Sequence, residues 1–193
     1  YETAFSLKPE GALAMKIYEA RAQGAPNVSA ARELQRWVRE HPKDSAAGLY
    51  LGGVYLAAGD HVRATEQYRQ VLKSDAQNPA AFNNLAWALH GAGQNKEALA
   101  YAEQAYRVAS QSPVVMDTYG FFLVENGRVT QGTELLRKAA AAAPDQQDIH
   151  YHLGAALAKA GDKPAARAVL EKAQSLATEP KTKAQIKALL ESL

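Results

Sequence analysis

The side chains that could do chemistry in this sequence are a few histidines and carboxylates. Five histidines are present, and the one close pair, His150 and His152, lies two positions apart. On a helix this spacing turns the two rings about 200° away from each other, so they cannot share a metal ion. Asp117 and Glu125 lie eight positions apart, which separates them by about 12 Å along a helix. We interpret these two carboxylates as solvated charges and not as a catalytic pair.

The remaining composition argues against several classes of protein. The sequence has no cysteine, which excludes disulfides, thiolate metal sites and a cysteine nucleophile. It contains no Gly-x-Ser-x-Gly elbow and no phosphate-binding glycine-rich loop. The net charge of +2 comes without a clustered basic stripe, which disfavours nucleic-acid binding. No stretch approaches the roughly 18 apolar residues of a membrane span. We therefore predict no enzyme activity, no cofactor and no metal site.

An internal repeat of 34 residues organises the chain. One column of this repeat consists of glycines, namely Gly59, Gly93, Gly127 and Gly161. Two further columns hold small residues, namely Gly52, Ala86, Gly120 and Gly154, and Ala64, Ala98, Gly132 and Ala166. We expect each glycine of the first column to take a left-handed conformation where a first helix ends and a second begins. The small columns predict a close approach of the two helices, with large side chains such as Tyr68, Leu136 and Leu170 between them.

Helix-end signals accompany each repeat. Asp60 and Asp162 follow the turn glycines, and we expect them to cap the second helices. Pro164 suits the first turn of such a helix, where its missing N–H donor is not needed. Other prolines lie near the predicted unit borders and are expected to stop the second helices. These are Pro42, Pro79, Pro113, Pro144 and Pro180.

The pattern resembles the tetratricopeptide (TPR) repeat, which implies an all-α protein, a right-handed α-solenoid of helix hairpins. The predicted complete units are 45–78, 79–112, 113–146 and 147–180, and residues 11–44 form a degenerate unit. Residues 1–10 resemble the tail of a truncated preceding repeat, so we expect the sequence to be a fragment of a longer protein. Residues 181–193 carry apolar residues at helical spacing and predict a C-terminal capping helix near the true C-terminus. These apolar residues are Ile186, Leu189, Leu190 and Leu193.

Trp87 identifies the face that a partner could use. At about 100° per residue, its side chain points about 150° away from the face that packs within its own unit. In stacked TPR units this side of the first helix lines the concave surface. Trp87, Phe121 and Tyr151 are thus predicted to project into one trough that binds a protein or peptide. Packing of these rings against the neighbouring first helix is an alternative that the sequence leaves open. The predicted concave-face residues are Leu49, Asn83, Trp87, His90, Asp117, Phe121, Glu125 and Tyr151.

Two TPR subfamilies lead to different expectations. Chaperone-binding TPR domains clamp a carboxylate with inner-face lysines, asparagines and an arginine. Asn84 occupies one of those columns, but Leu49, Gly53, Val114 and Thr118 occupy others, so no such clamp is expected. The stretches "NNLAWAL" (83–89), "MDTYGFFLVENGR" (116–128) and "IHYHLGAALAKAGDKPAAR" (149–167) instead resemble the C-terminal region of PEP-CTERM system TPR-repeat lipoproteins.

That resemblance implies a protein-protein interaction scaffold of the bacterial envelope, linked to exosortase protein sorting, exopolysaccharide and biofilm. It implies a periplasmic or outer-membrane-associated location without direct membrane insertion by this fragment, while a cytoplasmic location stays open. An alternative is a regulatory or substrate-recruiting TPR array of a larger enzyme such as a glycosyltransferase. A third interpretation is self-association through the truncated N-terminal end, which would expose apolar surface.

Overall fold

The computed structural model describes residues 10–23 and 27–193, and these residues form helices joined by short loops, with no strand among them. The chain divides into two compact units, residues 1–101 and 102–193, and the border between them falls within helix α7 (Asn95–Val108). Residues 1–9, which hold most of the predicted remnant of a preceding repeat, lie outside the described residues.

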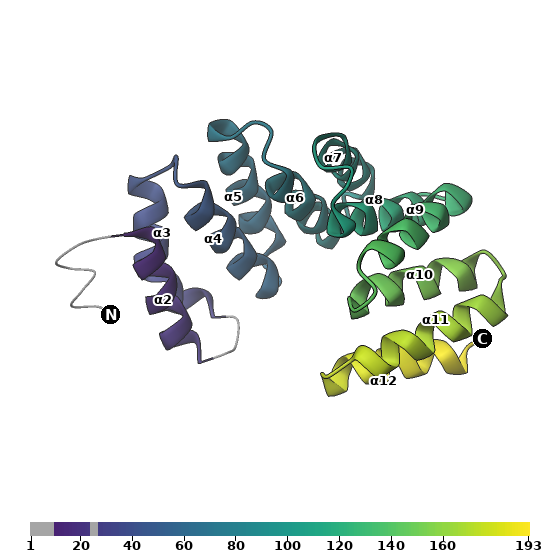
Figure 1. Ribbon diagram of the computed structural model, residues 1–193. Coiled ribbons are helices and arrows are strands. Elements are labelled where there is room, and N and C mark those ends of the chain that lie inside the picture. The colour runs from purple at the N-terminus through teal and green to yellow at the C-terminus, as the bar shows by residue number, and fades with distance from the viewer. Residues whose placement is uncertain (1–9, 24–26) are drawn as a thin grey trace. The chain divides into compact units, whose positions relative to one another are not determined.

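The helices of the first unit follow one another in chain order (Figure 1). Helices α2 (Gly11–Ala22), α4 (Ser45–Ala57) and α6 (Pro79–Gly91) contact one another in this order. Each is followed by a second helix: α3 (Arg32–Glu40) after the 3-10 turn η1 (Val28–Ala31), then α5 (His61–Ser74), then the start of α7. Helices α2 and α3 lie within residues 11–44, the segment for which a degenerate unit is predicted.

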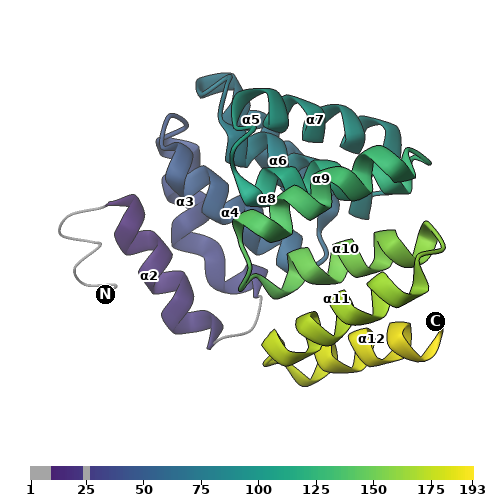
Figure 2. The same cartoon turned by 45° about the vertical axis from the view of Figure 1, so that its right-hand side comes forward.

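The second unit repeats this arrangement (Figure 2). Helix α8 (Pro113–Glu125) packs on α9 (Val129–Ala142), and α10 (Gln147–Lys159) packs on α11 (Lys163–Leu176). The first helices α8 and α10 also contact each other. We propose the unit borders inferred from the repeat, since α4, α6, α8 and α10 begin at Ser45, Pro79, Pro113 and Gln147.

The turn glycines adopt the predicted left-handed conformation. Gly59, Gly93, Gly127 and Gly161 have φ angles of 75°, 77°, 82° and 83°. Around Gly59, the Asp60 N–H donates to the Tyr55 carbonyl at 2.9 Å and the Gly59 N–H donates to the Leu56 carbonyl at 3.0 Å. The same pair of bonds recurs at the other three glycines. This Schellman motif satisfies the last carbonyls of the first helix and reverses the chain into the second.

The helix starts agree with the sequence signals more closely than the predicted stops do. The Asp60 and Asp162 side chains accept bonds from the Arg63 and Ala165 N–H groups, and Pro164 lies in the first turn of α11, as predicted. Pro42 and Pro144 follow the ends of α3 and α9. The expectation that prolines stop second helices is wrong for the other three, because a proline fits the first helical position, where no N–H bond is needed. Pro79, Pro113 and Pro180 are the first residues of α6, α8 and α12 (Pro180–Glu191).

The repeat positions that hold small residues allow the two helices of a hairpin to pack closely. A Cβ atom added to Gly52 of α4 would lie 2.4 Å from Tyr68 Cε1 of α5, and one added to Gly154 of α10 would lie 2.5 Å from Leu170 Cγ of α11. Both Tyr68 and Leu170 are fully buried. In these two hairpins the large side chain of the second helix thus fills the space that the glycine of the first helix leaves free.

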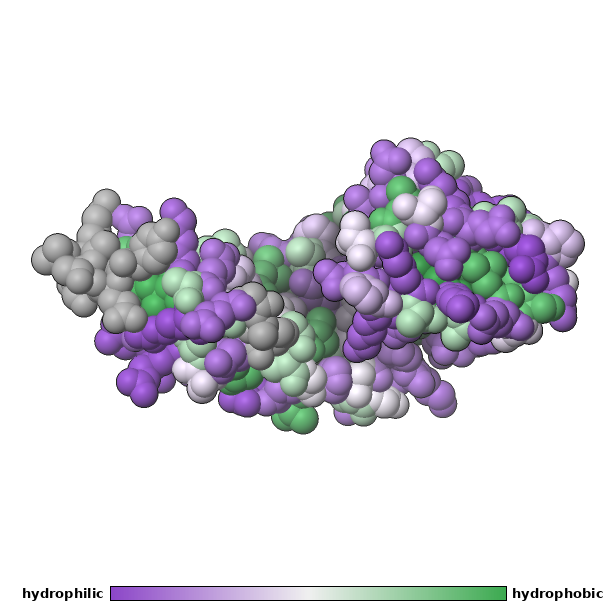
Figure 3. Space-filling model, turned by 90° about the horizontal axis from the view of Figure 1, so that it is seen from below, coloured by the Kyte–Doolittle hydropathy of each residue, from purple (hydrophilic) through white to green (hydrophobic). Residues whose placement is uncertain are grey.

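The predicted capping helix packs as expected. Ile186 and Leu190 of α12 are buried against Leu170, Ala173 and Ala177 of the α11 segment, with Leu189 and Leu193 partly buried beside them. The lysines of α12, namely Lys181, Lys183 and Lys187, are exposed. In Figure 3, hydrophobic residues form a band bordered by hydrophilic ones in the part of the view that holds α11 and α12.

The close packing at Gly52 can be tested by substitution of two adjacent residues of α4. Gly52→Ala is expected to lower the free energy of unfolding by about 1–3 kcal/mol, because the new methyl group overlaps the Tyr68 ring. Gly53→Ala is the matched control, since its Cβ would meet only the Tyr68 hydroxyl at 3.9 Å. The control should gain about 0.5–1 kcal/mol from its better helix propensity. Equal effects of the two substitutions in urea denaturation would contradict this packing.

Candidate functional site

The eight residues predicted for the concave face all lie on first helices. Leu49 is on α4, and Asn83, Trp87 and His90 are on α6, in the first unit. In the second unit, Asp117, Phe121 and Glu125 are on α8 and Tyr151 is on α10. A single trough that joins Trp87 with Phe121 and Tyr151 would combine residues of both units, and it stays a prediction.

Trp87 is half-buried. Its ring meets the ring of His90 edge-on, with the centroids 6.2 Å apart, and His90 Nδ1 lies 2.8 Å from Asn95 Oδ1. Trp87 is not among the fully buried side chains of α6, which include Leu85, Ala86 and Leu89. A half-exposed indole beside an imidazole offers a partner both apolar area and hydrogen-bonding groups.

Asn83 and Asp117 differ from the prediction because both are buried, at 6% exposure each. The interpretation of Asp117 as a solvated charge is therefore wrong. Its carboxylate oxygens lie 3.0 and 2.9 Å from Nδ1 of His152, across the contact between α8 and α10. The Asn83 amide donates to Asn84 Oδ1 at 3.2 Å, while Asn83 Oδ1 accepts no hydrogen bond from the residues that the structure describes.

An aromatic cluster surrounds the Asp117–His152 pair in the second unit. The His152 ring centroid lies 5.0 Å from that of Phe121 and 5.9 Å from that of Tyr151. All three rings are half-buried. At the other end of α8, Lys159 of α10 donates to the Val124 carbonyl at 3.1 Å and approaches Glu125 Oε1 at 3.3 Å. Glu125 is exposed, as predicted for a solvated charge.

A comparable contact joins two first helices in the first unit. The Tyr50 hydroxyl of α4 donates to Glu19 Oε1 of α2 at 2.9 Å, and the Tyr50 ring meets Tyr18 edge-on at 5.8 Å. Burial, the hydrogen bond to Glu19 and the charge of Glu19 raise the pKa of Tyr50 to about 12. Tyr50 and His152 belong to one column of the 34-residue repeat, so in both units this column ties a first helix to an acidic residue of the preceding first helix.

His152 and Tyr50 were missed by sequence reasoning, which treated His152 only as half of a metal pair. The available signal was the sequence separation of the contacting residues. Asp117 and His152 are 35 residues apart, as are Val124 and Lys159, which is one more than the repeat length. Such an offset connects equivalent faces of consecutive first helices. Sequence alone does not say which of the residues near this offset touch, because the answer depends on the rotation of each helix about its axis.

The described residues hold no cluster of three or more histidine, aspartate or glutamate side chains that could bind a metal ion. Among these same residues, no helix has the length and apolar character needed to cross a bilayer.

Comparison with known families agrees with the repeat pattern. A tetratricopeptide repeat model matches residues 15–79, a model described as YpiA-like C-terminal tetratricopeptide repeats matches 79–146, and a further tetratricopeptide repeat model matches 123–193. Together these matches extend over nearly the whole chain. The chain belongs to the tetratricopeptide repeat proteins.

Solved structures show the same fold. TTC0263, a thermophilic TPR protein of Thermus thermophilus, is 19% identical with a TM-score of 0.77, and the match covers 94% of this chain and 100% of that one. PilW, a type IV pilus biogenesis factor, is 18% identical with a TM-score of 0.73 and coverages of 94% and 92%. YrrB, a TPR protein with an unusual peptide-binding site, is 16% identical with a TM-score of 0.62 and coverages of 97% and 97%. At these identities the likeness establishes the α-solenoid fold.

A search of curated proteins found no match.

The Tyr50–Glu19 contact predicts a loss of stability at high pH. Because the pKa of Tyr50 is about 12 in the folded protein and about 10 in an unfolded chain, the folded state keeps a proton that the unfolded state releases. The contribution is complete below about pH 10 and disappears as the pH rises toward 12. The free energy of unfolding should therefore fall more steeply between about pH 10 and 12 in the wild type than in Tyr50→Phe. Parallel pH profiles would show that the contact does not stabilise the fold.

The contact between Asp117 and His152 is expected to stabilise the second unit. His152→Ala should lower the free energy of unfolding by about 1–3 kcal/mol, because the buried Asp117 carboxylate loses its hydrogen-bond partner. Glu125→Ala is the control, since it removes an exposed ion pair with Lys159 and should change stability by about 0.5 kcal/mol or less. Urea denaturation measures both, and an equally mild effect of His152→Ala would rule out a structural role for the pair.

Proposed function

We propose that this chain is a protein-protein interaction scaffold whose first helices bind a protein or peptide segment along their inner face. The observation that carries this proposal is the partial exposure of Trp87, Phe121 and Tyr151. Tyr151 is also packed against the core of α11 and α12, so only part of its ring is left for a partner. TPR membership supports the proposal, and one structural relative, YrrB, is described as having a peptide-binding site.

The chemistry of the inner face favours a partner that supplies apolar side chains. A half-buried aromatic ring still exposes surface that a partner can remove from water. A fully buried aromatic side chain buries about 150–250 Å². Polar groups lie beside them, with His90 next to Trp87 and His152 next to Phe121 and Tyr151. Such rings with a polar surround are the usual anchors of a binding interface.

The finer proposal places this scaffold in an envelope protein-sorting and exopolysaccharide system of the exosortase type. It rests on the sequence stretches that resemble PEP-CTERM system lipoproteins. The structural likeness to PilW, described as a type IV pilus biogenesis factor, concerns the fold. The partner would then be a protein of the same envelope system.

The proposal is tested by removal of the indole. Trp87→Ala should weaken partner binding by about 2 kcal/mol or more, because a central aromatic anchor is lost, while the fold persists. Wild-type and variant proteins would first capture partners from an envelope extract of the source cell, and titration calorimetry with the captured partner would then measure affinity.

Val62→Ala is the matched control, because Val62 is 75% exposed on the second helix α5 and away from the first-helix face. Unchanged affinity in Trp87→Ala would contradict the proposed site. A large loss of thermal stability in Trp87→Ala would show instead that the ring serves the core.

A further inference from the structure

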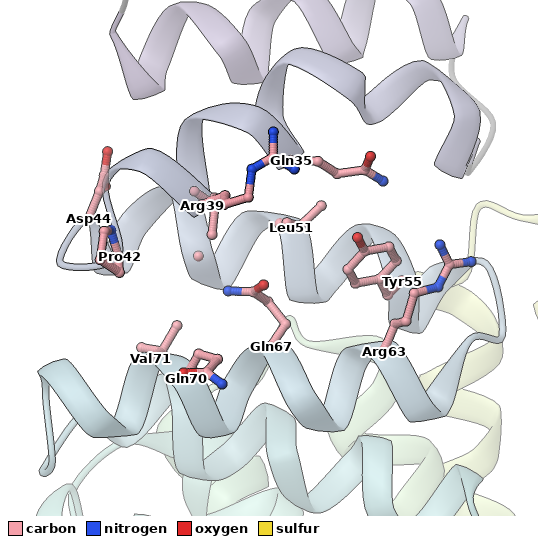
Figure 4. Close-up of a pocket in the computed structure, with 12 residues that line it drawn as sticks. Gln35, Arg39, Pro42, Asp44, Leu51, Tyr55, Arg63, Gln67, Gln70 and Val71 are labelled. Carbon is pink, nitrogen blue, oxygen red and sulfur yellow. The ribbon is translucent and has the colours of Figure 1, made fainter.

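A second concave surface lies in the first unit, on the side of the second helices. It is a groove of about 470 Å³ between α3 and α5, with α4 as its floor and the loop around Pro42 at one end. Figure 4 shows Gln35 and Arg39 on the α3 side, Gln67 and Arg63 on the α5 side, and Leu51 and Tyr55 between them. Its volume lies within the range of ligand pockets, roughly 300–1,000 Å³. Leu49, of the inner face, follows the floor residue Gly48 by one position and points about 100° away from it.

The floor of the groove is apolar and tightly packed. Leu51, Val71 and Tyr55 contribute to it but are only 3%, 2% and 8% exposed. Gly48 lets α5 come close, since a Cβ atom there would lie 2.8 Å from Val71 Cγ2 and 3.3 Å from Gln67 Nε2. Little apolar area is therefore left on which the apolar face of a helix could be buried.

The walls of the groove carry three carboxamides that face an open space. Gln35 extends from α3, and Gln67 and Gln70 extend from α5. None of them forms a hydrogen bond with the residues that the structure describes. A carboxamide offers both an N–H donor and a carbonyl acceptor, which match the N–H and C=O groups of a main chain. An extended peptide has these groups available, whereas a helix has already used its own.

The charges of the groove favour an acidic occupant. Asp44 is its one lining carboxylate, and both oxygens are engaged, Oδ1 by the Ala47 N–H at 3.0 Å and Oδ2 by Trp37 Nε1 at 2.7 Å. Arg63 lies 4.8 Å from the centre of the Tyr55 ring and pairs with Asp60. Arg39 is exposed and has no ion-pair partner within residues 10–23 and 27–193. A carboxylate of a partner would form an ion pair with the Arg39 guanidinium.

We propose that the α3–α4–α5 groove binds an extended peptide segment of a partner protein that carries acidic side chains. The carboxamides of Gln35, Gln67 and Gln70 pair with the main chain of the peptide, and Arg39 binds one of its carboxylates. The site uses the second helices and is separate from the inner face of the proposed function. The two surfaces can therefore succeed or fail independently.

The test uses NMR spectroscopy of the isotope-labelled chain with three blocked heptapeptides, in which alanine alternates with glutamate, lysine or glutamine. The glutamate peptide should shift the side-chain amide signals of Gln35, Gln67 and Gln70, and the lysine peptide should not. Arg39→Gln should weaken binding of the glutamate peptide about tenfold, the loss expected for one charge-assisted hydrogen bond. The control is Arg137→Gln, which changes an exposed arginine of α9 in the other unit.

Three outcomes would overturn the proposal: no shift with the glutamate peptide at millimolar concentration, shifts spread over both units, or equal weakening by Arg39→Gln and Arg137→Gln. The last two would indicate general attraction to a cationic surface. Gln67→Ala, which keeps every charge, provides a second variant and should also weaken binding. Trp87→Ala should leave the glutamate peptide's affinity unchanged, so failure of the inner-face proposal is distinguished from failure of this one.

Discussion

The close approach of the two helices in each hairpin is the constraint on which the rest of the structure depends. At Gly52 and Gly154 there is no room for a methyl group, because Tyr68 and Leu170 of the second helices occupy the space. The left-handed glycines at the hairpin turns aim the second helix back along the first. Small residues on one helix and large ones on the other thus produce a closely packed core in these hairpins. The same spacing repeats every 34 residues from Gly52 to Gly154.

The hairpin core uses only part of the surface of each first helix, and the remaining surface makes other contacts. Polar contacts there join consecutive first helices, Glu19 with Tyr50 in the first unit and Asp117 with His152 in the second. Phe121 and Tyr151, beside the second of these contacts, remain half-exposed, although Tyr151 also packs against the core of α11 and α12. The second helices, meanwhile, leave a groove between α3 and α5 in which glutamines lie without partners among the described residues. The two surfaces that we propose for binding thus differ in chemistry, one being aromatic and the other amide-rich and cationic.

Much of this fold could be predicted from the sequence, because its signals are local. The turn glycines, the capping aspartates and the small columns each act within one hairpin, and the apolar stripe Ile186 to Leu193 identified the last helix. The predictions were weaker where contacts depend on how consecutive helices are rotated. Asp117 looked like a solvated charge, yet His152 of the next first helix covers it. Pro79 and Pro113 were assigned to helix ends although they begin helices, since a proline near a border suits either role. The groove beside Arg39 had no sequence signal, because its glutamines come together only after α3 and α5 pack on α4.

The central claim is that hairpin packing is complete without the Trp87 ring, which stays available to a partner. Acrylamide quenching of tryptophan fluorescence in a Trp37→Phe background measures this directly, because Trp87 is then the sole tryptophan of the chain. We expect the free protein to be quenched to an intermediate degree, between a buried and a fully exposed indole, and the captured partner to reduce that quenching. Resistance to acrylamide in the free protein, unchanged when the partner is added, would show that the ring is sealed in the core and would contradict the account.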